Sequence, residues 1–207
     1  MDAWHPIVPS HELESGDCIV QAFADGIDFA LWRSRAGAVQ AWENRCAHRS
    51  VRLSLGRVID DQLACGYHGW RYAPGGQCTY RPSNPRAPAP KGLGIRTFPA
   101  VEVGGMVWVA SGAEAPAIRP PFDIEHIVFC RSFVVRSRLA KVADALSRRG
   151  RLARGHWAGK IDELPAAAYV LAAKADRTVL HVWCHQPGDA LRVSAAFRKL
   201  RDSVERS

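Results

Sequence analysis

Long hydrophobic runs and an export signal are both missing from this 207-residue sequence. Every apolar run falls short of the roughly 18–20 residues that a helix needs to cross a bilayer, so we expect no membrane partner. The first residues, MDAWHPIVPSHELESGD, have neither a basic head nor an apolar stretch. We therefore expect no secretory signal and a cytoplasmic location.

Net charge is absent from the first part of the chain and concentrated in the second. Residues 1–118 carry 11 basic and 11 acidic side chains, whereas residues 119–207 carry 17 and 9, which accounts for the net charge of +8. Four arginines gather in residues 148–154. Such a patch attracts acidic proteins or anionic substrates, and is equally typical of a solvated face. Because no nucleic-acid-binding motif accompanies it, we do not expect nucleic acid as a partner.

The six cysteines are not the signature of a disulfide framework, because no export signal accompanies them. Cys46 and Cys65 each have a histidine nearby at metal-ligand spacing. The other four lack such a histidine, and we interpret them as buried apolar residues. These four are Cys18, Cys78, Cys130 and Cys184.

Short apolar runs separated by glycine turns occupy the first half of the chain, which is typical of an antiparallel β sandwich or barrel. Proline-rich residues 81–90 predict a surface loop. We expect a first domain over residues 1–112, a linker over 113–122 and a small α+β domain over 123–207. The predicted strands of the first domain are Cys18–Phe23, Ile27–Arg33, Val39–Trp42, Ile95–Val101 and Met106–Val109.

The second domain combines helical and extended patterns. Helix-spaced apolar residues predict a helix over Leu139–Arg149 and a terminal helix that Asp189 caps. We predict strands at Phe129–Val135, Ala167–Ala173 and Thr178–Cys184. The terminal helix should bury Val193, Ala196, Phe197, Leu200 and Val204.

Two arms of mixed ligands carry the chemical signal. The string CAH starts at Cys46 and the string CGYH starts at Cys65, with 16 residues between His48 and Cys65. A [2Fe–2S] cluster with two thiolates on one iron and two imidazoles on the other needs this donor set. A structural zinc site also uses Cys2His2, but its usual spacing keeps the cysteines in one arm and the histidines in the other. Accidental proximity is a further alternative, which the presence of two well-spaced arms disfavours. A site that has lost its cluster is another, which the intact ligand set disfavours.

The strings CAHR from Cys46 and CGYHGW from Cys65 resemble the Rieske motif of the non-haem-iron ring-hydroxylating oxygenases and demethylases. Flanking segments extend the similarity over about residues 4–112: WHPIV from Trp4, LSLGRV from Leu53, FPAVE from Phe98 and MVWV from Met106. Respiratory Rieske proteins have an extra cysteine in each cluster loop. Ser50 and Gly69 follow the arms here, so the chain resembles the oxygenase or ferredoxin type.

The resemblance implies a mainly β Rieske domain with a cluster-binding subdomain. Its implied [2Fe–2S] ligands are Cys46, His48, Cys65 and His68. The rings of Tyr67 and Trp70 would shield the cluster from water, or serve ordinary loop packing. Arg49 would contact a partner or an acidic group, or be solvated.

Oxygenases of this family also have a catalytic domain, in which two histidines and a carboxylate hold a mononuclear iron. The predicted helix Leu139–Arg149 has Asp144 but no histidine, so we recognise no complete site and doubt a mononuclear Fe(II). His181 and His185, with Asp162 or Asp189, are weaker candidates that we interpret as surface or hydrogen-bonded side chains. We expect the second domain to be a shortened remnant of the helix-grip catalytic fold.

Two functions follow from the resemblance. The chain is either a one-electron transfer component of an oxygenase system, or an oxygenase component (a ring hydroxylase or demethylase) with its own or a subunit-shared mononuclear iron. The implied partners are an NAD(P)H-dependent reductase or ferredoxin and an oxygenase partner subunit, in a homo- or hetero-oligomer. A basic binding module with a structural metal is a third interpretation. Whether the chain is itself an enzyme, its substrate and its reductase stay open.

Overall fold

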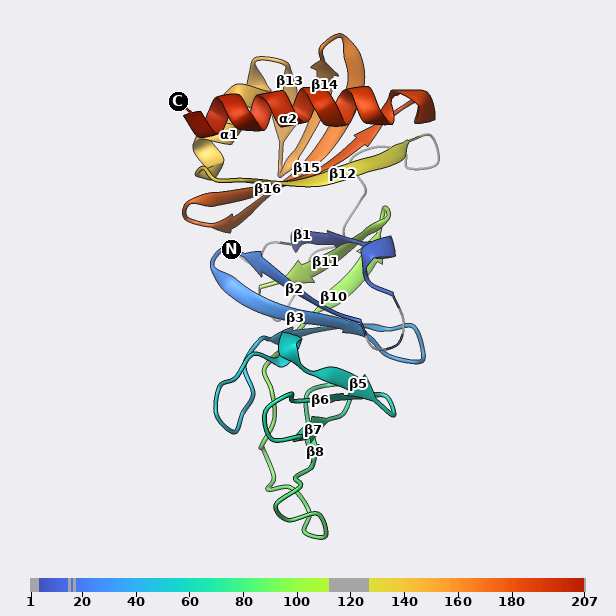
Figure 1. The fold of residues 1–207 in the computed structure, drawn as a ribbon, viewed down its shortest axis with the longest axis vertical. Coiled ribbons are helices and arrows are strands. Elements are labelled where there is room, and N and C mark those ends of the chain that lie inside the picture. Colours follow the sequence, from blue (N-terminus) through green and yellow to red (C-terminus); the bar gives the residue numbers. More distant parts are fainter. Residues whose placement is uncertain (1–3, 15, 17, 112–126, 207) are drawn as a thin grey trace. The chain divides into compact units, whose positions relative to one another are not determined.

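The computed structural model describes residues 4–14, 16, 18–111 and 127–206, and divides the chain into two compact units (Figure 1). The first unit comprises Met1–Phe23 and Ile27–Ala117, and the second comprises Ala24–Gly26 and Ile118–Ser207. The predicted linker 113–122 lies outside the described residues. In the described parts of the chain, no helix is both long and apolar enough to span a membrane.

Three antiparallel sheets make up the first unit, which confirms a mainly β architecture. Their strand orders are β1-β11-β10, β2-β3-β4-β9 and β5-β6-β7-β8. The first two sheets contain β1 (Trp4–Pro9), β2 (Ile19–Ala24), β3 (Ile27–Arg33), β4 (Val39–Glu43), β9 (Thr97–Phe98), β10 (Ala100–Val103) and β11 (Met106–Ala110). The third contains β5 (Arg57–Ile59), β6 (Gln62–Ala64), β7 (Arg71–Tyr72) and β8 (Cys78–Tyr80).

Glycine turns join these strands where the sequence predicts them. Asp25 and Gly26 have φ angles of 46° and 81° between β2 and β3, and Gly104 and Gly105 have 68° and 67° between β10 and β11. Left-handed backbone of this kind is most accessible to glycine, aspartate and asparagine, which is why these residues mark the hairpins. The proline-rich segment 81–90 has no helix or strand, as predicted.

One hydrophobic core ties the third sheet to the rest of the unit. Trp32 and Trp42, on β3 and β4, pack edge to face with their ring centroids 5.2 Å apart, and Tyr72 of β7 lies 6.4 Å from Trp42. Leu53 and Leu63 are fully buried in the same cluster, which also includes Cys46 and Cys65. The two cysteines therefore belong to the hydrophobic core that joins the third sheet to the second.

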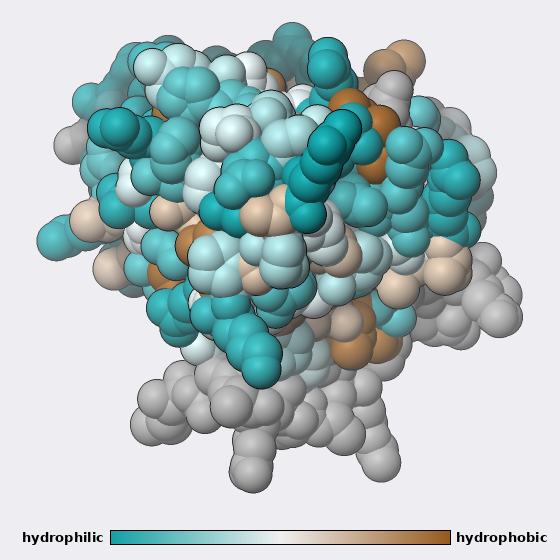
Figure 2. All heavy atoms as spheres, turned by 90° about the horizontal axis from the view of Figure 1, so that it is seen from below, coloured by the Kyte–Doolittle hydropathy of each residue, from teal (hydrophilic) through white to brown (hydrophobic). Residues whose placement is uncertain are grey.

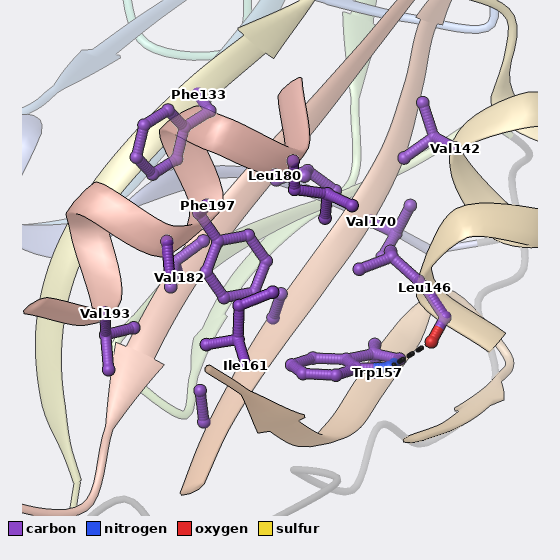
Figure 3. Packing of buried hydrophobic residues seen from close by; sticks show 14 of the residues in the cluster. Phe133, Val142, Leu146, Trp157, Ile161, Val170, Leu180, Val182, Val193 and Phe197 are labelled. Carbon is purple, nitrogen blue, oxygen red and sulfur yellow. Dashed lines mark hydrogen bonds between the residues drawn. The ribbon is translucent and has the colours of Figure 1, made fainter. Parts of the chain in front are cut away.

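The second unit is an antiparallel sheet of strand order β12-β16-β15-β14-β13, with helices α1 and α2 on one face (Figures 1 and 3). The buried residues of α2 are the five that the sequence predicts, and Phe197 among them packs edge to face on Trp157 at 5.6 Å. The Trp157 indole donates a hydrogen bond to the Leu146 carbonyl at 2.9 Å, which joins β14 to α1. The elements are β12 (Val128–Val135), α1 (Leu139–Ser147), β13 (Gly150–Ala153), β14 (His156–Ile161), β15 (Leu164–Lys174), β16 (Arg177–Cys184) and α2 (Ala190–Arg206).

Several details differ from the sequence prediction. In the first unit, strands β1 and β5–β8 were not predicted, and the predicted strand Ile95–Val101 is divided into β9 and β10. Helix α1 ends at Ser147 rather than Arg149, because the chain turns there into β13. Strands β13 and β14 were not predicted. Their pairing brings Gly150 opposite Gly159, where a Cβ on either would lie 2.4 Å from a backbone oxygen. The Asp189 carboxylate accepts a hydrogen bond from Arg192 at 3.1 Å, and the residue ends a short 3-10 helix before α2.

Candidate metal centre

Two loops with the same backbone hydrogen bonding carry the predicted ligands. In the loop after β4, the Cys46 N–H donates to the Val51 carbonyl at 2.9 Å, and the Ser50 N–H donates back to the Cys46 carbonyl at 2.8 Å. In the loop between β6 and β7, the Cys65 N–H donates to the Trp70 carbonyl at 2.8 Å, and the Gly69 N–H donates to the Cys65 carbonyl at 3.0 Å. Each cysteine thus bonds to the residues four and five positions later, so the two arms are structural repeats.

The fourth residue after each cysteine adopts a left-handed conformation. Ser50 has φ 55° and Gly69 has φ 67°. This conformation turns the chain back toward the cysteine, but it is less favourable for serine than for glycine. Because this left-handed conformation occurs in both loops, the two loops share one backbone shape, although the histidine follows the cysteine by two residues in the first loop and by three in the second.

The predicted histidines meet at the surface between the loops. The Nδ1 atoms of His48 and His68 lie 3.1 Å apart, and both side chains are exposed. Trp70 stacks on the His48 ring with centroids 4.5 Å apart and an interplanar angle of 5°. The Tyr67 ring lies 3.8 Å from the His68 ring and is 61% exposed. Two aromatic rings therefore flank the imidazole pair, and Tyr67 itself remains open to solvent.

The predicted cysteines lie beneath the histidines, each only 4% exposed. Burial raises the pKa of the Cys65 thiol, and the neighbouring Cys46 thiol adds to this effect. The backbone N–H groups of Tyr67 and His68 oppose it, because they donate hydrogen bonds to the Cys65 sulfur. Thiols become ligands as thiolates, so a bound metal has to displace their protons.

The pKa of the His48 imidazole shifts in the opposite direction to that of the Cys65 thiol. Desolvation lowers the pKa of His48, and the nearby charges of His68 and Arg49 lower it further. The neutral imidazole that results is the form that binds metal. Arg49 is exposed and has no carboxylate partner within the described ranges.

The donor set fits a binuclear cluster. The sulfur atoms form a buried pair and the histidine nitrogens form an exposed pair, as a [2Fe–2S] cluster with unlike ligands on its two irons requires. Among the described residues, no three His, Cys, Asp or Glu side chains gather as a group for a single metal ion.

One residue of the centre was missed by sequence reasoning. The Tyr72 hydroxyl lies 3.1 Å from the Cys46 sulfur, across 26 residues of sequence. Burial raises the pKa of Tyr72, and the contact with Cys46 adds to the rise. The only signal was its place in the string GWRY that follows the second arm.

The weaker candidate ligands of the second unit do not come together. His181 is buried on β16 with its Nδ1 2.8 Å from the Ser132 hydroxyl, whereas His185 is exposed. Asp162 accepts from Lys199 at 3.4 Å, and Asp189 pairs with Arg192 as described above. The third carboxylate that we considered, Asp144, is exposed on α1.

The remaining cysteines follow the prediction only in part. Cys78 and Cys184 are buried, but Cys18 and Cys130 are half-buried. Burial, reinforced by the neighbouring Cys184 thiol, raises the pKa of Cys130 to about 12.

Comparison with known proteins decides the family of the first unit. Residues 3–99 match the family described as the Rieske [2Fe-2S] domain. This part of the chain is a Rieske domain. Its cofactor is accordingly a Rieske-type [2Fe–2S] cluster.

Curated relatives match the Rieske part of the chain. The oxidoreductase NdmD of Pseudomonas putida is 40% identical over 113 residues, which cover 54% of this chain and 19% of that protein. The oxygenase subunit of 3-chlorobenzoate-3,4-dioxygenase from Comamonas testosteroni is 36% identical over 110 residues, covering 53% and 26%. The chain thus spans about a quarter or less of the length of these relatives, and it is related to the Rieske oxygenases through its first unit.

Solved structures share the fold of both units. Dicamba monooxygenase bound to dicamba aligns with 98% of this chain and 86% of its own, at 18% identity and a TM-score of 0.74. NdmA of Pseudomonas putida CBB5 aligns with 98% and 79%, at 18% identity and a TM-score of 0.69. The Rieske domain is therefore followed by a small α+β part that has a counterpart in these structures.

Proposed function

We propose that Cys46 and Cys65 bind one iron of the Rieske cluster and that His48 and His68 bind the other. The support is the buried sulfur pair, the 3.1 Å approach of the two Nδ1 atoms and the matching backbone of the two loops. Two neutral imidazoles in place of thiolates reduce the negative charge of the cluster and raise its reduction potential.

On this assignment, the chain is a one-electron carrier in a non-haem-iron oxygenase system. It accepts an electron from an NAD(P)H-dependent reductase or ferredoxin and passes it to a mononuclear iron on a partner. The exposure of the histidine pair is the observation that carries this proposal. Because electron tunnelling falls steeply with distance, a cluster ligated by surface imidazoles can exchange electrons with a docked protein.

A second candidate function is favoured by the fold of the second unit. Its sheet and helices have counterparts in a monooxygenase structure, aligned over 98% of this chain. An oxygenase component with its own or a subunit-shared mononuclear iron would have the same fold. Among the residues that the structure describes, no three histidine, cysteine or carboxylate side chains gather to hold a single metal ion, so we place this function second.

The iron content of the purified protein separates the two functions. A carrier holds two irons and two acid-labile sulfides per chain, whereas an oxygenase with a resident mononuclear site holds three irons. The carrier also takes up one electron per chain on reductive titration and returns it to a chemical oxidant. A third iron that is lost on replacing a carboxylate or histidine of the second unit contradicts the carrier proposal.

A further inference from the structure

The zero net charge of residues 1–118 conceals a strong separation of charge within the first unit. Residues 45–91 contain both arms and the sheet β5-β6-β7-β8, and carry eight basic against two acidic side chains, a net charge of +6. Outside residues 45–91, the described residues of the first unit carry three basic against five acidic side chains, a net charge of −2. The first unit is therefore an electric dipole whose positive end is the cluster-binding subdomain.

Most of this positive charge is free to act on a partner. Six of the eight basic side chains are exposed, and the subdomain's two ion pairs, Arg52–Asp28 at 3.5 Å and Arg71–Asp60 at 3.8 Å, are both long. Figure 2 views the molecule from the side of β5–β8 and shows hydrophilic side chains interspersed with paler and a few hydrophobic ones. The exposed basic residues are Arg45, Arg49, Arg52, Arg57, Arg86 and Lys91.

Apolar side chains lie among these charges. Leu55 is 70% exposed and Tyr67 is 61% exposed. The backbone of Leu55 touches the second cluster loop, because a Cβ on Gly66 would lie 2.5 Å from the Leu55 carbonyl oxygen. An apolar centre with a polar rim is the usual composition of a protein–protein interface.

The same face has a hollow beside the cluster loop. A cavity of about 510 Å³ is lined by Leu55, Arg57, Cys65, Arg71 and Tyr80, among others. The Arg57 guanidinium has no carboxylate partner among the residues described, and that of Arg71 lies over the Tyr80 ring at 5.1 Å. Two guanidinium groups thus border an opening next to a proposed iron ligand.

We propose that this face docks an acidic electron-transfer protein, with a carboxylate of that partner entering the hollow between Arg57 and Arg71. The inference rests on the proposed carrier function and specifies the chemistry of its partner. In the complex, the partner's reduced centre loses one electron and the oxidised cluster gains one, with no bond made or broken. The negative end of the dipole repels the same partner, so the charge separation orients the encounter and speeds association.

Stopped-flow reduction of the holoprotein tests this proposal. The electron donor is a reduced, acidic plant-type [2Fe–2S] ferredoxin, and the variants are Arg57→Glu and Arg198→Glu. Arg198 is exposed in the middle of α2, so its reversal changes the total charge equally without altering the docking face. At low salt, Arg57→Glu should slow reduction about threefold to tenfold and Arg198→Glu should leave it nearly unchanged. Added salt should slow the wild type more than Arg57→Glu, because it screens the attraction.

A second donor separates failure of docking from failure of the carrier function. Photoreduced deazariboflavin is small and uncharged, so it should reduce the cluster of the wild type and of both variants at equal rates. The reduction potential of the cluster should also be the same in all three proteins. If it reduces the cluster but Arg57→Glu matches the wild type with ferredoxin, the docking proposal is overturned and the carrier function stands. Equal slowing by Arg198→Glu also overturns it, because the effect then reports total charge. If deazariboflavin fails to reduce the wild-type cluster, both proposals fall.

Discussion

The Tyr72 hydroxyl lies 3.1 Å from the Cys46 sulfur, inside the core that supports both cluster loops. A cluster-bound cysteine is a thiolate and accepts hydrogen bonds, so in the loaded protein Tyr72 is the donor. Its raised pKa keeps the phenol protonated. Hydrogen bonds to the sulfur ligands are among the features that set the potential of an iron–sulfur cluster, because they favour the reduced, more negative state.

Replacing Tyr72 with phenylalanine should therefore lower the reduction potential while the cluster is retained. If the hydrogen bond stabilises the reduced state by about 1 kcal/mol more than the oxidised state, the one-electron potential falls by about 40 mV. Redox titration followed by visible absorption measures this shift. Tyr80→Phe is the control, because Tyr80 is half-buried in the same sheet and its ring packs against the Arg71 guanidinium. Equal potentials in the wild type and Tyr72→Phe would show that the contact does not tune the cluster.

Gly66 should tolerate no side chain, because backbone atoms of Leu55 occupy the space that a Cβ at this position would need. A Cβ there would lie 2.5 Å from the Leu55 carbonyl oxygen, which a folded protein cannot accommodate without moving the cluster loop. We expect Gly66→Ala to destabilise the protein by about 1–3 kcal/mol and to lower its iron content. Thermal unfolding and iron analysis measure the two effects. Gly188→Ala is the matched control, since a Cβ at Gly188 meets nothing within 4 Å, and equal behaviour of the two variants would contradict the close approach.

The ion pair between Arg33 and Glu102 should make stability depend on pH. Arg33 Nη2 donates to Glu102 Oε1 at 2.8 Å, and this hydrogen bond holds the pKa of Glu102 below its ordinary value. A lowered folded-state pKa stabilises the fold above the unfolded pKa, and the stabilisation is lost as pH falls through the folded pKa. Glu102→Gln should therefore cost about 1 kcal/mol at neutral pH and progressively less in acid.

Urea unfolding over a descending pH series measures this dependence. Glu43→Gln serves as the control, because the described residues place no cationic side chain on the Glu43 carboxylate. If the free energy of unfolding of Glu102→Gln is lower than that of the wild type by the same amount at every pH, the lost stability does not come from the ionised carboxylate.

Local patterns made much of this fold predictable. The five-residue apolar stripe of α2 is buried as its periodicity predicts, and the strands of the first unit begin and end near glycine turns. The arms at Cys46 and Cys65 were found for the same reason. Each is a short local string in which a cysteine and a histidine at metal-ligand spacing can be recognised without knowing the fold.

Features that depend on tertiary contacts escaped prediction. Strands β13 and β14 were missed because the arginines of residues 148–154 mask any apolar alternation, and because Gly150 and Gly159 have meaning only when paired. The hydrogen bond of Tyr72 to Cys46 joins residues 26 positions apart, and the place of Tyr72 after the second arm does not by itself identify Cys46 as its partner. The charge separation was missed because the count over residues 1–118 sums to zero.

The central claim is that Cys46, His48, Cys65 and His68 together hold one [2Fe–2S] cluster. Iron and acid-labile sulfide per chain, measured in the wild type, His68→Ala and Cys65→Ser, test it most directly, with Cys18→Ser as the control. The account predicts two irons and two sulfides in the wild type and in Cys18→Ser, with an electron paramagnetic resonance signal on reduction, and loss of the cluster in the other two variants. An unaltered cluster in His68→Ala or Cys65→Ser, or a wild-type protein that binds zinc without sulfide, would contradict it.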